Sequence, residues 1–318
     1  GGEFEAGLLH LADSLQESRI IHERQTGPVV SLERQDFLIP DRSDLPPLSR
    51  YARLKDVDDS EKQVGYVEAS RGCKHLCRHC PVVPVYAGKF RIVQPEIVLE
   101  DIRRQVSAGA EHITFGDPDF FNGIGHALPL VETLQREFPD LTYDATIKVE
   151  HLLKHAKHLS ILQETGCKII TTAVESLDDT VLFKLNKGHT RADFIRALQI
   201  CREHLITLNP TFIPFSPWTT AEGYADLLET LSNLELIEEV APVQLAIRLL
   251  IPEGSLLLEL ADIQEVIAPF RPESLNYPWK HAEPRVDQLQ EVISGIIKRG
   301  LSEKASRKEI FGAVWEEA

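Results

Sequence analysis

Residues 64–80 read VGYVEASRGCKHLCRHC, an apolar run that leads into three cysteines spaced as CxxxCxxC. The run Val64–Ala69 has the length and composition of a buried β-strand. Cys73, Cys77 and Cys80 are therefore expected on the loop that follows this strand. The loop is too short for a core of its own, and its clustered thiols indicate one metal centre.

Two kinds of metal centre fit three clustered thiols. Three thiolates leave one iron of a four-iron cluster without a protein ligand, and that iron can bind a substrate or cofactor. A structural zinc site would need a fourth ligand, for which the candidates are His75, His79, Cys167 and Cys201. A second paired-ligand motif, usual for zinc knuckles, is missing from the sequence. Iron–sulfur binding is favoured, with zinc and unliganded thiols as the alternatives.

Downstream of the cysteines, strand-like and helix-like segments alternate as far as Leu250. The expected strands are Val64–Ala69, His112–Phe115, Leu141–Ile147, Lys168–Val174, Ile206–Phe212 and Pro242–Ile247. The expected helices are Pro95–Ala108, Ala127–Phe138, His151–Thr165, Asp178–Leu185, Ala192–His204 and Ala221–Glu235. This alternation predicts an α/β fold with a parallel sheet, either an open partial barrel or a doubly wound sheet. In both architectures ligands bind at the carboxyl ends of the strands.

Composition and charge narrow the class of protein. The chain of 318 residues has 34 Lys and Arg against 49 Asp and Glu, a net charge of −15 that disfavours nucleic acid as a partner. No apolar stretch reaches the roughly 18 residues of a membrane span, and the start has no secretory signal, so a cytoplasmic protein is expected. Because the sequence contains no Met, we expect it to be a piece of a longer protein.

The cysteine loop and the strands around it resemble the radical SAM superfamily over about Val64–Leu250. This resemblance implies a partial (β/α)6, TIM-like barrel. It also implies that Cys73, Cys77 and Cys80 hold a 4Fe-4S cluster whose fourth iron binds S-adenosylmethionine. His79 departs from the family pattern, where an aromatic residue is commoner. Basic residues crowd the loop of this acidic chain, which suits an anionic cluster and an acidic reductant such as flavodoxin or ferredoxin.

The resemblance and the strand-end rule also indicate residues that contact the cofactor. Gly116 permits close backbone approach, and Asp117 or Asp119 is expected to accept from the ammonium group of S-adenosylmethionine. A plain Asx-Pro turn is the alternative. The remaining candidates are Glu175, Ser176, Thr211, Gln244 and Arg248. Glu175 needs a partner at the end of an apolar run, and Gln244 and Arg248, four apart on an expected strand, would share one face.

Particular segments resemble a radical SAM subgroup with a cobalamin-binding-type N-terminal domain and a Cys-containing C-terminal tail. These segments are 116–123, 214–220 and 244–250. The arsinothricin-pathway enzyme, which transfers the 3-amino-3-carboxypropyl group from S-adenosylmethionine to arsenite, resembles this subgroup. No Asp-x-His-x-x-Gly cobalamin motif and no cysteine tail occur here. We expect residues 1–60 to be the end of the N-terminal domain with a linker, 61–255 the radical SAM core, and 256–318 a helical extension.

The leading functional hypothesis is an enzyme that reductively cleaves S-adenosylmethionine and modifies or alkylates a small molecule. The first alternative is transfer of the aminocarboxypropyl group to an acceptor such as arsenite. The second is a non-catalytic iron–sulfur or zinc scaffold. No nucleic-acid or membrane partner is expected.

Overall fold

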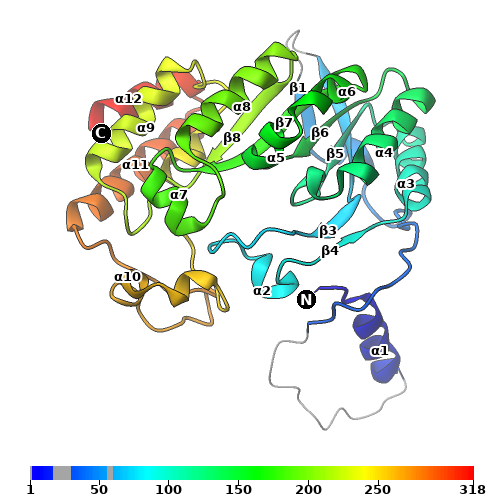
Figure 1. Ribbon diagram of the computed structural model, residues 1–318, viewed down its shortest axis with the longest axis horizontal. Coiled ribbons are helices and arrows are strands. Elements are labelled where there is room, and N and C mark those ends of the chain that lie inside the picture. The colour runs from blue at the N-terminus through cyan, green and yellow to red at the C-terminus, as the bar shows by residue number, and fades with distance from the viewer. Residues whose placement is uncertain (1, 17–29, 56–59) are drawn as a thin grey trace.

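A curved sheet forms the centre of the computed structural model, which describes residues 2–16, 30–55 and 60–318 (Figure 1). Its strand order is β1-β2-β5-β6-β7-β8. The strands are β1 Arg53–Lys55, β2 Glu61–Val67, β5 His112–Phe115, β6 Thr142–Thr146, β7 Cys167–Glu175 and β8 Thr207–Phe212. Strand β1 is antiparallel to β2, and the other neighbouring pairs are parallel. The carboxyl ends of five strands therefore meet at one edge.

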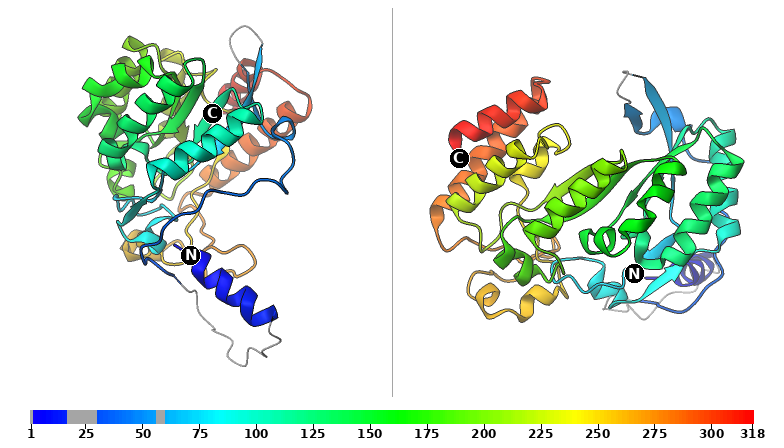
Figure 2. Two further views of the ribbon diagram at one scale, coloured as in Figure 1. Left: turned by 90° about the vertical axis from the view of Figure 1, so that its right-hand side faces the viewer. Right: turned by 45° about the horizontal axis from the view of Figure 1, so that its top comes forward.

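Helices cover the outer side of this sheet (Figures 1 and 2). They are α3 Pro95–Ser107, α4 Ile124–Glu137, α5 Val149–Lys154, α6 Leu159–Glu164, α8 Arg191–Glu203 and α9 Ala221–Asn233. The short helix α7, Asp179–Leu185, lies instead at the edge of the barrel (Figure 1), where Val181 and Leu185 belong to a second apolar cluster. Pro95 occupies the first turn of α3, and a capping box of Thr190 and Asp193 begins α8. Apolar side chains such as Ile102 and Phe194 are fully buried against the strands.

The expectation of an α/β partial barrel is confirmed, but two of its elements differ from those predicted. The expected helix His151–Thr165 is divided into α5, a 3-10 turn η3 at Ala156–His158, and α6. The expected strand Pro242–Ile247 is wrong, because a 3-10 helix η4 spans Pro242–Ala246.

The physical reason for the missing sixth strand lies in its own side chains. Pro242 has no N–H to donate to a ladder, and it occupies the first turn of η4. The side-chain oxygen of Gln244 accepts the hydrogen bond of the Phe212 N–H, in place of a backbone carbonyl. Regular pairing is thereby reduced to one parallel bridge, between Phe215 and Arg248.

The C-terminal segment packs on the barrel. It contains η5 Leu256–Glu259, α10 Ala261–Gln264, α11 Pro284–Ser302 and α12 Arg307–Glu317. Ile293 of α11 and Val314 of α12 are fully buried in the same apolar core as the sheet. Figure 2 shows α11 and α12 side by side next to α9. The expected helical extension is present, and it shares its core with the barrel.

The N-terminal helix α1, Glu5–Gln16, extends away from the sheet (Figure 2). Arg71 ties this region to a small antiparallel pair, β3 Ser70–Gly72 and β4 Phe90–Ile92, by ion pairs with Glu5 and, at 3.5 Å, with Glu3. Residues 17–29 and 56–59 of the expected N-terminal segment lie outside the described residues. No helix among the described residues has the length and apolarity that a membrane crossing requires.

Candidate functional site

The cysteine loop runs from β3 to the short helix α2, Val83–Tyr86, next to the carboxyl ends of the barrel strands (Figure 1). Main-chain contacts hold it in place. The Arg78 N–H donates to the Leu185 carbonyl at 2.9 Å, and the Arg78 carbonyl accepts from the Ser255 hydroxyl at 2.8 Å. The Asn186 amide donates to the Leu76 carbonyl at 3.1 Å. The end of α7 and the start of η5 therefore position the loop from outside.

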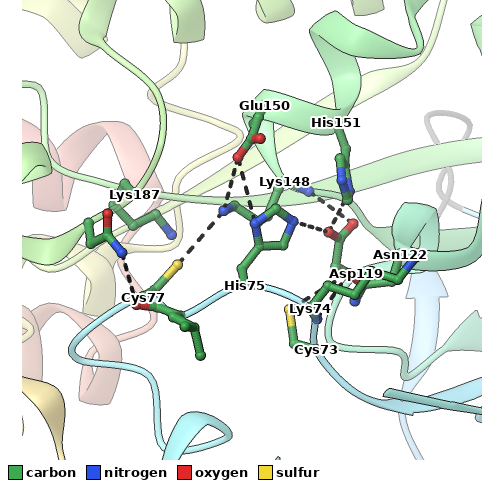
Figure 3. Close-up of polar contacts among 12 residues, drawn as sticks. Cys73, Lys74, His75, Cys77, Asp119, Asn122, Lys148, Glu150, His151 and Lys187 are labelled. Atoms are coloured by element: carbon green, nitrogen blue, oxygen red, sulfur yellow. Dashed lines mark hydrogen bonds and ion pairs between the residues drawn. The ribbon is translucent and has the colours of Figure 1, made fainter. Parts of the chain in front are cut away.

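All three loop cysteines are free thiols. Cys77 is buried, and its Sγ lies 3.8 Å from the ammonium nitrogen of Lys148 (Figure 3). The Cys73 Sγ lies 3.9 Å from the side-chain oxygen of Asn122. Burial raises the pKa of the Cys73 and Cys80 thiols. Thiolates here need positive partners, such as the buried Lys148 and iron ions, so the donor set suits an iron–sulfur cluster.

The other two cysteines belong to the core. Cys167 on β7 and Cys201 on α8 are 3% and 0% exposed among apolar side chains. Burial raises the pKa of Cys201 to about 12 and that of Cys167 further still. Neither thiol is suited to ionise as a fourth ligand.

Glu175 closes β7 and is 7% exposed, with a backbone φ of 70°. The sequence indicates that this carboxylate needs a partner, and the structure provides two. The His79 Nε2 lies 3.0 Å and the Lys187 Nζ 3.3 Å from the same Glu175 oxygen. Burial by itself raises the Glu175 pKa, but the Lys187 charge and the His79 contacts outweigh it and lower the pKa to about 2. His79, the residue that departs from the family pattern, thus links the cysteine loop to the barrel.

The segment after β5 begins with Gly116 and Asp117, which contact the strand and loop beside it. An added Cβ at Gly116 would overlap the Tyr66 ring, so this position requires glycine or a displaced tyrosine. The Asp117 carboxylate accepts from the Ala69 N–H at 2.9 Å and from the Ser70 hydroxyl. Burial raises the Asp117 pKa to about 6, although these hydrogen bonds lower it. Asp117 therefore anchors the chain just before the cysteine loop.

Asp119 and Ser176 follow β5 and β7. One oxygen of Asp119 accepts from the Phe121 N–H at 3.3 Å, which caps the 3-10 helix η2, Phe120–Gly123. The Ser176 hydroxyl oxygen accepts from the Asp178 N–H at 3.1 Å, just before α7.

The last three candidates lie along β8 and the chain beside it. Thr211 is half-buried on β8, opposite Ala173. The expectation that Gln244 and Arg248 share one face of a strand is wrong, because Gln244 belongs to η4. The Arg248 guanidinium donates to Asp287 at 2.7 Å and to the Trp279 carbonyl at 2.8 Å, and it stacks on the Trp279 ring.

Sequence reasoning missed Lys148 and His151, and for Lys187 it left both a structural and a catalytic role open. Lys148 directly follows the predicted strand Leu141–Ile147, so the strand-end rule applies to it as well. No local signal marks Lys187 or His151. Their importance comes from the residues that folding brings beside them (Figure 3).

Comparison with known proteins shows the family of this chain. The family model for the radical SAM superfamily matches residues 67–231, just over half of the chain. The chain therefore belongs to the radical SAM superfamily, whose cofactors are a 4Fe-4S cluster and S-adenosylmethionine.

Two curated relatives show the breadth of this family. A tRNA-2-methylthio-N(6)-dimethylallyladenosine synthase of Desulfosudis oleivorans is 28% identical over 57% of this chain and 39% of its own length. A hopanoid C-3 methylase of Methylococcus capsulatus is 26% identical over 48% of this chain and 29% of its own length. The chain thus spans well under half of either relative.

Two solved structures share the fold. OxsB, a cobalamin-dependent S-adenosylmethionine radical enzyme with aqua-cobalamin and S-adenosylmethionine bound, superposes with a TM-score of 0.63 at 17% identity. The match covers 74% of this chain and 41% of OxsB. The radical S-adenosylmethionine methyltransferase TsrM from Kitasatospora setae superposes with a TM-score of 0.60 at 19% identity, over 74% of this chain and 48% of TsrM. Both confirm a barrel of the radical SAM type.

Proposed function

We propose that this chain is the core of an enzyme that cleaves S-adenosylmethionine reductively and modifies or alkylates a small substrate. One observation carries the proposal. Three free thiols lie on one loop next to the carboxyl ends of a parallel barrel, with the buried Lys148 beside Cys77. Cys73, Cys77 and Cys80 would hold a 4Fe-4S cluster, which supplies the electron that breaks a carbon–sulfur bond of the sulfonium.

Residues around the loop have separate proposed roles. Gly116 offers its backbone to the cofactor, while Ser176 and Thr211 offer hydroxyl groups after β7 and along β8. Glu175 acts indirectly. Its Oε1 already contacts His79 and Lys187, so it holds His79 in place and, through His79, the cysteine loop. We propose that Asp117 positions the loop through Ala69 and Ser70.

For Gln244 and Arg248, the observed contacts favour packing roles rather than cofactor binding. The Gln244 side chain completes the edge of β8, and Arg248 is paired with Asp287 and Trp279. The other candidate at β5, Asp119, has one oxygen committed to capping η2 and the other directed at two histidines.

Anaerobic reconstitution with iron and sulfide tests the proposal. We expect cluster absorbance at about 400 nm and dithionite-dependent cleavage of S-adenosylmethionine. Mass spectrometry then distinguishes the reactions, because hydrogen abstraction gives 5′-deoxyadenosine and aminocarboxypropyl transfer gives 5′-methylthioadenosine. If the chain binds a cluster but does not cleave S-adenosylmethionine, it is an iron–sulfur scaffold and the proposed enzymatic function is refuted.

The partners follow from the charge of the chain. A net charge of −15 disfavours an RNA substrate, although several relatives are named as tRNA-modifying enzymes. We propose a small-molecule substrate, flavodoxin or ferredoxin as reductant, and a cytoplasmic location.

Cobalamin and the domain division remain proposals. OxsB is cobalamin-dependent and TsrM binds cobalamin, so gel filtration of this chain with hydroxocobalamin is the direct test. We propose a core of residues 61–255 with a preceding linker segment, 1–60, and a following helical extension, 256–318. Limited proteolysis would test these boundaries, and cleavage within 256–318 is expected to destabilise the core it shares.

A further inference from the structure

Three side chains from separate parts of the chain converge beside the cysteine loop (Figure 3). His75 lies within the loop, Asp119 caps η2 after β5, and His151 lies on α5 after β6. The Asp119 Oδ2 is 2.7 Å from the His151 Nδ1 and 3.6 Å from the His75 Nε2. The three ligand atoms all lie within 4.8 Å of one another.

None of these three atoms makes a hydrogen bond of acceptable geometry, although the Asp119 Oδ2 and the His151 Nδ1 are in ion-pair contact at 2.7 Å. They are the Asp119 Oδ2, the His151 Nδ1 and the His75 Nε2. Asp119 is 0% and His151 7% exposed. A buried polar atom without a well-formed hydrogen bond costs about 1–3 kcal/mol, so three such atoms close to one another indicate a common partner.

Surrounding contacts help to orient two of the three side chains, Asp119 and His75. The other Asp119 oxygen accepts from the Phe121 N–H at 3.3 Å and the Lys148 N–H at 3.4 Å, which directs Oδ2 toward the histidines. The His75 Nδ1 lies 3.6 Å from a Glu150 oxygen, so the carboxylate favours a proton there and leaves Nε2 with its lone pair. Metal-binding histidines are commonly oriented by a carboxylate in this way.

We propose that His75, Asp119 and His151 bind one divalent first-row transition metal ion, such as Zn²⁺ or Fe²⁺, separately from the cysteine ligands. Ligand atoms at about 2.1 Å from such an ion lie about 3.0–3.4 Å apart, and the two measured Asp119 separations bracket this range. Two imidazoles and one carboxylate suit these ions. Three protein ligands leave coordination positions open, so the ion can also bind a substrate oxygen or water.

This site extends the proposed function without resting on it. Because His75 lies between Cys73 and Cys77, the ion would be a second metal centre next to the loop. The candidate roles of the cysteines are unaffected.

Co²⁺ binding to the reconstituted protein tests the proposal, since the cluster then occupies the cysteines. We expect one Co²⁺ per chain, with visible ligand-field bands that lack strong sulfur charge-transfer absorbance. His75→Gln and His151→Gln should each weaken binding by at least about 100-fold, because loss of an orienting neighbour alone costs 10–100-fold. His155→Ala is the matched control, because His155 ends the same helix but provides none of the three converging atoms.

The outcomes separate this proposal from the radical SAM assignment. Support requires Co²⁺ loss in both Gln variants with cluster absorbance and the circular dichroism spectrum retained. The proposal is overturned if the wild-type chain binds no Co²⁺, or if both Gln variants, each folded, bind it as wild type does. S-adenosylmethionine cleavage is measured separately, so its failure would not be confused with either result.

Discussion

Lys187→Met removes the buried cation that faces Glu175, and we expect it to be strongly destabilising. Lys187 and Glu175 are 3% and 7% exposed, and their charged atoms are 3.3 Å apart. With the lysine gone, the carboxylate keeps only His79 as a partner in a site that excludes water. Breaking a buried ion pair from one side typically costs about 3–5 kcal/mol.

The lowered pKa of Glu175 gives a similar free energy for this interaction. Its fall from 4.5 to about 2 corresponds to about 3 kcal/mol of stabilisation of the charged form in the folded state. Because this pKa is lowered by folding, the stabilisation is complete above about pH 4.5 and is lost as the pH falls toward 2. In Lys187→Met the burial remains without the cation, so the Glu175 pKa rises. The deficit of the variant is therefore largest near pH 7 and shrinks in acid.

Urea denaturation of the anaerobic, metal-free chain at pH 7 and pH 5 measures the effect. We expect Lys187→Met to lose about 3 kcal/mol of unfolding free energy at pH 7 and Lys187→Met/Glu175→Gln to recover at least half of it. Lys184→Met is the matched control, because Lys184 forms a half-buried ion pair with Asp262 that is worth about 1 kcal/mol. A loss below about 1 kcal/mol for Lys187→Met, or a double variant as unstable as the single one, would refute the reasoning.

Three further predictions concern the same region. Cys77→Ala should abolish both cluster absorbance and S-adenosylmethionine cleavage, whereas Cys167→Ala and Cys201→Ala should retain them; cluster loss in either core variant would contradict the three-ligand assignment. Asp117→Asn should flatten the pH dependence of unfolding free energy, because a pKa raised to about 6 makes wild-type stability fall by about 2 kcal/mol as the pH rises from 4 to 6. Denaturation series at those pH values check this, and an unchanged slope would contradict it. Arg248→Met should cost about 1–2 kcal/mol of stability through its lost contacts with Asp287 and Trp279, with the Kd for S-adenosylmethionine unchanged; a Kd raised tenfold would instead show that Arg248 binds the cofactor.

The proposed metal site also bears on Asp119. If its free oxygen ligates an ion between His75 and His151, the same oxygen is unavailable to the ammonium group of S-adenosylmethionine. Asp119→Asn would then lower Co²⁺ affinity more than S-adenosylmethionine affinity. The two binding isotherms, measured on one reconstituted preparation, compare these roles directly.

Local sequence determined much of this protein. The CxxxCxxC spacing defines the three candidate ligands, because neighbouring residues of a short loop are close whatever the rest of the chain does. The alternating apolar periods predict five of the strands to within a few residues, since period and turn chemistry are properties of adjacent residues. The same locality explains the error at Pro242–Ile247. Its apolar pattern suits a strand, but pairing depends on β8 and on the Gln244 side chain.

Tertiary structure alone decided which side chains meet. Glu175 needs a partner on any reading of its sequence, but His79 lies 96 positions away and could be identified only after the chain folded. His75, Asp119 and His151 likewise come from three separate strand-end segments, and their separations depend on sheet curvature and side-chain rotamers. Burial then sets the energies, because the same carboxylate or imidazole in water would have neither a shifted pKa nor an unsatisfied atom.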